Sequence, residues 1–123
     1  MPWTLSLLQP ERIVLTEYLA PMTGGEVMTA TRETVAFARE HEVCRFLSDC
    51  TRFAQVGTPF EVFELIRLYE VLQLPPGMRD AVLLPKSDQA REDMRFYETA
   101  SRNRGYDVRL FVDRQAAIDW LIR

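Results

Sequence analysis

Hydrophobic and polar residues alternate along two stretches near the beginning of the chain, over residues 3–9 and 12–19. Alternation with a period of two is typical of β-strands that have two different faces. The short turn at 9–11 joins the two stretches and predicts an antiparallel hairpin. Within the second stretch, Ile13 is expected on the opposite face of the strand from Thr16.

A period close to that of the α-helix begins after residue 23 and returns three more times. Each helical stretch follows a residue that can cap a helix, namely Thr23, Thr58, Ser87 or Asp88, and Asp113. A glutamate three residues after each threonine completes the capping-box pattern, and Pro59 occupies a first helical position. We therefore expect four helices, ending near residues 41, 72, 104 and 122.

Three further apolar runs, over residues 43–49, 81–84 and 106–112, lie between these helices and predict strands. The predicted order is β-β-α-β-α-β-α-β-α. Alternation of strands and helices is typical of α/β proteins with parallel strands and right-handed crossovers. We expect a mixed five-stranded sheet with an N-terminal antiparallel hairpin and four helices. The short connections predict a single domain over residues 1–123.

The C-terminal part carries the most specific pattern. It comprises residues 96–98 (FYE), residues 102–111 (RNRGYDVRLF), then Asp113 and Ala117 with the final Trp-Leu at 120–121. Together with the element order, this pattern resembles the STAS fold of sulfate transporters and anti-sigma-factor antagonists. It is most similar to the SpoIIAA-like (STAS/SEC14-like) branch. The resemblance implies a STAS-like domain that acts as a non-enzymatic protein-interaction or regulatory module.

Anti-sigma-factor antagonists carry a phosphorylatable serine at the start of the second helix, in an Asp-Ser-Ser/Thr-Gly context. The stretch that matches it here is residues 55–60 (QVGTPF), which lacks that string. Thr58 supplies the hydroxyl at the corresponding place. Thr58 is therefore a candidate phospho-acceptor or anion site, beside its simpler role as a helix cap.

The second helix has more apolar residues than one buried face requires. Its inner stripe is formed by Val62, Leu65, Ile66, Tyr69 and Leu72. Phe60, Phe63 and Val71 fall outside that stripe. They are explained either by a broad core face or by an exposed apolar patch.

Two hypotheses use this region of the chain. In the first, a protein partner or a second copy in a homodimer covers a surface made of Asp49, Phe53, Phe60, Phe63 and Tyr69. In the second, a pocket near loop 49–60 holds a small apolar or lipid-like ligand, and the same aromatic residues line it. The first is our leading interpretation from the sequence.

Charge and composition exclude several classes of partner. The net charge is −3, so we expect no nucleic-acid binding. The apolar runs are far shorter than the roughly 20 residues that span a bilayer, so we expect no membrane insertion and no signal peptide. The single histidine and two cysteines do not match a zinc spacing, and we expect neither a metal nor a cofactor.

Candidate catalytic residues are few, and we expect no enzymatic activity. Ser48 lacks the G-x-S-x-G context of a hydrolase nucleophile. Asp49 and Asp113 both follow strands, but helix capping and loop hydrogen bonds explain them better than a catalytic pair. Cys44 is expected to be buried in its strand, and Cys50 to lie in a loop. Their spacing along an extended chain is too long for a disulfide, and two reduced thiols favour the cytoplasm.

Overall fold

The computed structural model describes residues 2–54, 57–75 and 77–123. Within these residues the predicted order of strands and helices is confirmed. The elements are β1 (Trp3–Leu8), β2 (Ile13–Tyr18), α1 (Gly24–Glu40), β3 (Arg45–Asp49), α2 (Pro59–Val71), β4 (Arg79–Leu83), α3 (Asp88–Asn103), β5 (Asp107–Phe111) and α4 (Arg114–Ile122).

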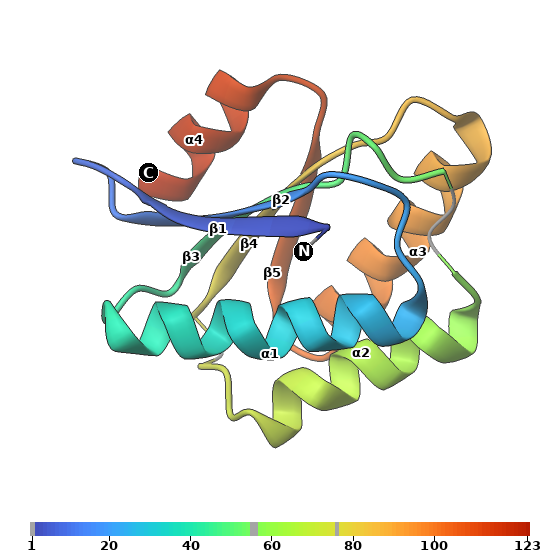
Figure 1. Cartoon of the computed structure of the whole chain (residues 1–123), viewed down its shortest axis with the longest axis horizontal. Helices are drawn as coiled ribbons and strands as arrows, with labels where there is room; N and C mark the ends of the chain where they lie inside the picture. Colours follow the sequence, from blue (N-terminus) through green and yellow to red (C-terminus); the bar gives the residue numbers. More distant parts are fainter. Residues whose placement is uncertain (1, 55–56, 76) are drawn as a thin grey trace.

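The strands form one mixed sheet in the order β1-β2-β3-β4-β5 (Figure 1). β1 pairs antiparallel with β2, and every other neighbouring pair is parallel. Each crossover moves one strand further in the same direction, so right-handed crossovers place their helices on one face of the sheet. Figure 1 shows α1, α2 and α3 together on that face, with α4 on the opposite face.

This winding has a consequence for where a ligand can bind. Doubly wound α/β sheets bind ligands in the crevice where the strand order reverses. The order of the described strands runs in one direction, so that crevice is not formed. A binding site is better sought between the sheet and the three helices that cover one face.

The helices begin where the capping residues predicted. Thr23 and Thr58 both form complete capping boxes with the glutamate three residues later. Ser87 caps α3 by accepting from the Ala90 amide, and Asp113 caps α4 by accepting from the Ala116 amide. Capping uses only neighbouring residues, which explains why the sequence was sufficient to place it.

Two clusters of buried side chains lie on either side of the sheet. The cluster under α4 is the smaller one, and its buried members are Ile13, Leu15, Leu47, Ala81, Leu83, Ala117, Trp120 and Leu121. The larger cluster lies against α1, α2 and α3 and contains most of the aromatic residues. Both faces of β2 are covered, so Ile13 and Thr16 are buried although they point to opposite sides.

The predicted start of β3 differs from the structure by two residues, and this changes the place of Cys44, whereas Cys50 lies in the loop after β3 as predicted. β3 begins two residues later than predicted, so Cys44 precedes the strand and is exposed. Cys50 is buried, because its amide donates to the Leu83 carbonyl and draws the chain inward beside β4. Burial raises the pKa of the Cys50 thiol well above its usual value, and the charges of Asp80 and Asp49 add to the shift.

Candidate functional site

A cavity of ≈ 110 Å³ lies between the sheet and the three helices on its larger face. An engineered apolar cavity of about 150 Å³ admits benzene, so this space is on the scale of a small organic molecule. Side chains from β2, β3, β4, α1, α2 and α3 line it. The apolar and aromatic part of the lining includes Tyr18, Val27, Met28, Phe46, Phe53, Val62, Met78, Val82, Met94 and Tyr97.

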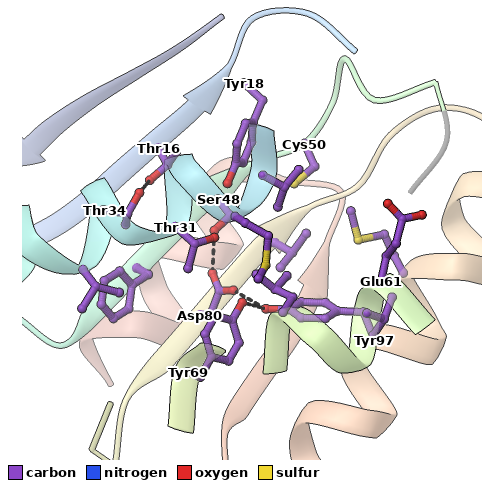
Figure 2. A pocket seen from close by; sticks show the side chains of 18 of the residues that line it. Thr16, Tyr18, Thr31, Thr34, Ser48, Cys50, Glu61, Tyr69, Asp80 and Tyr97 are labelled. Carbon is purple, nitrogen blue, oxygen red and sulfur yellow. Dashed lines mark hydrogen bonds between the residues drawn. The ribbon is translucent and has the colours of Figure 1, made fainter. Parts of the chain in front are cut away.

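A chain of hydrogen bonds crosses the floor of this cavity (Figure 2). The Ser48 hydroxyl donates to Oδ1 of Asp80 at 2.8 Å, and the Tyr97 hydroxyl donates to Oδ2 at 3.1 Å. The hydroxyls of Tyr97 and Tyr69 are 2.6 Å apart. These four residues come from β3, β4, α3 and α2, so the network joins the sheet to two of its covering helices.

The strand register explains how the polar groups meet. Thr16 in β2 lies directly opposite Ser48 in β3. Ser48 in turn lies opposite Val82 in β4, two residues beyond Asp80, so all these side chains point to the same face. The bond between Ser48 and Asp80 is thus a diagonal cross-strand contact. Thr16 also contacts Thr34 of α1, with 3.0 Å between the two hydroxyls.

Asp80 is the buried charged group of the site, with 6% of its surface exposed. Loss of hydration raises the pKa of its carboxyl to about 6, although the hydrogen bonds from Ser48 and Tyr97 act in the opposite direction. Burial also raises the pKa values of Tyr69 and Tyr97 above the usual range, so both phenols stay neutral at physiological pH.

The cavity opens between the first turns of α1 and α2. Lining residues there remain half-buried, among them Val27 and Met28 of α1 and Glu61 of α2. Glu61 accepts from the Thr58 amide at 3.1 Å, and its other carboxylate oxygen occupies the space that a side chain at Gly24 would need. Its negative charge is therefore held beside the N-termini of two helices, where helix dipoles favour an anion.

The residues predicted as one surface are divided between two places. Phe53 and Tyr69 are buried and line the cavity, where the hypothesis of a ligand pocket placed them and where a protein partner does not reach them. Phe60 and Phe63 lie outside the cavity, with 71% and 49% of their surfaces exposed. Phe63 packs edge-to-face against the half-exposed Phe96 of α3, with ring centroids 5.5 Å apart.

The other predicted residues have local partners. Asp49 is half-buried outside the cavity lining and accepts from the amide and hydroxyl of Thr51, at 3.0 and 2.6 Å. Asp113 caps α4, and the two carboxylates serve separate loops. The Thr58 hydroxyl is exposed and accepts from the Glu61 amide at 3.2 Å. Gln55 and Val56, from the stretch matched to the phospho-acceptor loop, lie outside the described residues.

Asp80 and its partners were not found from the sequence. The predicted strand began at residue 81, because Arg79 and Asp80 follow a Pro-Pro-Gly turn and look like part of it. Asp80 is covered by residues of α2, which precedes it in the chain, and of α3, which follows it, so its burial depends on contacts between distant parts of the sequence. The signals in the sequence were weak. Ser48 is a polar residue that follows Phe46 and Leu47 in a buried strand. Tyr69 and Tyr97 are tyrosines on the buried faces of their helices.

A second hollow of ≈ 490 Å³, more open to solvent, lies beside β5 and α4. Its lining includes residues of both charges, namely the acidic Glu98 and Asp119 and the basic Arg109 and Arg123. Because these charges remain partly or fully exposed, solvent weakens any interaction that they make. The cavity under α1, α2 and α3 is the better candidate for a binding site.

Residues 2–54, 57–75 and 77–123 contain no group of three or more histidine, cysteine, aspartate or glutamate side chains placed to hold a metal ion. None of the helices in this described part is both long and apolar enough to cross a membrane. The chain matches no family model, no curated protein and no solved structure.

Proposed function

We propose that this protein is a non-enzymatic binding domain whose cavity holds a small organic molecule. The observation that carries this proposal is the cavity of ≈ 110 Å³, which combines apolar walls with a hydrogen-bonded floor around Asp80. Sites for small molecules are typically concave, mostly apolar and supplied with a few placed polar groups. The two free thiols favour a reducing compartment, and we propose the cytoplasm.

The chain provides its own reporters for a test. Met28, Met78 and Met94 line the cavity, whereas Met22 does not. With methionine methyl groups labelled with ¹³C, we expect the neutral molecule benzyl alcohol to shift the three cavity signals in an NMR titration. The Met22 signal should stay in place. Absence of any shift at the cavity methionines would overturn the proposal.

A matched pair of variants locates the binding. Val27→Phe places a ring at the opening of the cavity, and we expect it to weaken binding at least about tenfold by filling the space. Val71→Phe adds the same ring at a residue of α2 with 66% of its surface exposed, and it should leave binding unchanged. Equal effects of the two substitutions would show that the probe binds elsewhere.

A second candidate function is protein interaction, as in STAS domains of the anti-sigma-factor antagonist type. It is favoured by the exposed aromatic patch of Phe60, Phe63 and Phe96, because exposed apolar groups of this kind often form protein interfaces. The partner is either a second copy, giving a homodimer, or another protein. The double substitution Phe60→Glu and Phe63→Glu should dissociate a dimer in sedimentation experiments, and an unchanged mass and unchanged pull-downs would exclude this surface.

A further inference from the structure

The hydrogen bonds between the hydroxyl groups on the cavity floor have defined donors and acceptors. Tyr97 donates its proton to Asp80, so in the 2.6 Å contact between the two phenols Tyr69 must donate to Tyr97. Ser48 also donates to Asp80. Each hydroxyl has a single proton to donate, and all three protons are used inside the network.

The hydrogen-bonding sites that this network leaves free are therefore acceptor sites. An ionised carboxylate has about four acceptor sites, and the protein fills two of those on Asp80. The oxygens of Ser48 and Tyr69 keep acceptor sites as well. A ligand group placed against Asp80, Ser48 and Tyr69 meets acceptors, and it binds there well only when it brings hydrogen-bond donors.

The charge of the lining points in the same direction. Among the described lining residues, Asp80 and Glu61 are the charged ones, and both are acidic. Asp80 thus has two neutral hydroxyl donors and no basic side chain of the cavity beside it. The rings of Tyr18, Phe53 and Tyr97 also line the space, and aromatic faces attract cations.

We propose that the cavity selects small organic cations, namely amines with an apolar or aromatic body, and that the ammonium group binds the Asp80 carboxylate. The apolar walls would then cover the body of the ligand, while Glu61 at the opening attracts the positive charge. This inference rests on the proposed function, because it names the chemical class of the ligand for the same cavity.

Three probes of nearly equal size separate charge from shape: benzylamine, benzyl alcohol and benzoate. At about pH 8, where both Asp80 and benzylamine are charged, we expect benzylamine to bind about tenfold more tightly than benzyl alcohol. Benzoate should bind most weakly. The signals of the cavity methionines report all three titrations.

Asp80→Asn tests the assigned partner of the ammonium group. This substitution keeps the shape and one acceptor oxygen but removes the charge, so benzylamine should fall to the affinity of benzyl alcohol. Asp49→Asn is the matched control, because Asp49 lies outside the cavity lining and should leave the preference unchanged. NMR spectra of both variants show directly whether each is folded.

The outcomes distinguish the two proposals. Equal binding of benzyl alcohol and benzylamine to the wild-type protein overturns the selection of amines and leaves the cavity a binding site for neutral molecules. Tighter binding of benzoate overturns it as well. A preference for benzylamine that persists in Asp80→Asn overturns the role of Asp80. Failure of all three probes to move the cavity signals overturns both proposals.

Discussion

Leu47 and Ser48 are neighbours in β3, and their side chains point to opposite faces of the sheet. Leu47 is fully buried in the apolar cluster under α4, which includes Ile13 and Trp120. Ser48 faces the three helices on the other side and donates to Asp80 on the floor of the cavity. The same strands thus build one face from apolar packing and another around buried polar groups.

This difference indicates how stability and function are distributed. Apolar side chains in close contact stabilise a fold without needing exact partners for polar atoms. A buried carboxylate costs free energy unless hydrogen bonds or charges compensate for lost hydration. The face under α1, α2 and α3 contains such a buried carboxylate, Asp80. A buried charged group of this kind is expected in a binding site rather than in a core that serves stability alone.

The largest effect is expected from Leu47→Ala on the α4 face. The substitution removes buried methyl groups and leaves a cavity, so we expect the free energy of unfolding to fall by about 4 kcal/mol. Urea unfolding followed by circular dichroism measures this loss. A loss below about 1 kcal/mol would show that this face is loosely packed and would remove the contrast between the two faces.

Changing pH should produce the next largest effect, through Asp80. Its pKa is raised from 3.8 to about 6 on folding, so the folded state holds the proton more tightly than the unfolded state. This contribution is fully present below about pH 4 and is lost as pH rises through about 6, a total of about 3 kcal/mol. Burial raises the pKa values of Cys50, Tyr69 and Tyr97, which face Asp80, so they stay neutral in this range.

Asp80→Asn isolates that contribution from the other carboxylates. Unfolding experiments at about pH 4 and pH 8 should show the variant gaining up to about 3 kcal/mol over the wild-type protein between the two conditions. The control is Val71→Ala, which changes an exposed residue and removes no titratable group, so its difference from the wild type should not vary with pH. A parallel pH dependence of Asp80→Asn and the wild-type protein would contradict a raised pKa at Asp80.

Ser48→Ala is the counterpart of Leu47→Ala on the cavity face, and its effect should be smaller and dependent on pH. The substitution removes a donor from the charged Asp80, which should cost about 2 kcal/mol at pH 8. It should also raise the pKa of Asp80 further, because the bond from Ser48 lowers that pKa. At about pH 4 the loss should shrink, and equal losses at both pH values would argue against a bond to the charged form.

Thr58→Ala should have the smallest effect. It removes the hydroxyl that caps α2, and we expect a loss of about 1 kcal/mol in urea unfolding, with benzyl alcohol binding retained. That result would show that Thr58 acts as the cap of α2 and takes no part in binding benzyl alcohol. Loss of binding to a protein partner in pull-downs, beyond this change in stability, would instead favour the phosphorylation switch predicted from the family resemblance.

The sequence by itself determined the α/β class, the order of the elements and the beginnings of the helices. Capping by Thr23, Thr58, Ser87 and Asp113 involves atoms three residues apart, and strand and helix periods are visible in short windows. The excess of apolar residues on the second helix singled out Phe60 and Phe63 and left open whether they belong to a broad core face or to an exposed patch. The structure decides for the exposed patch.

Only the tertiary structure decided which polar groups are buried together. Asp80 is 32 residues from Ser48 and 17 from Tyr97 along the chain, and no local pattern relates them. The sheet order places α1, α2 and α3 on one face, and this brings Asp80 into contact with Ser48 and Tyr97. It also buries Phe53 and Tyr69 and leaves Phe60 and Phe63 exposed. Burial and pKa depend on everything that surrounds a side chain in space, whereas capping depends on a few neighbours in sequence.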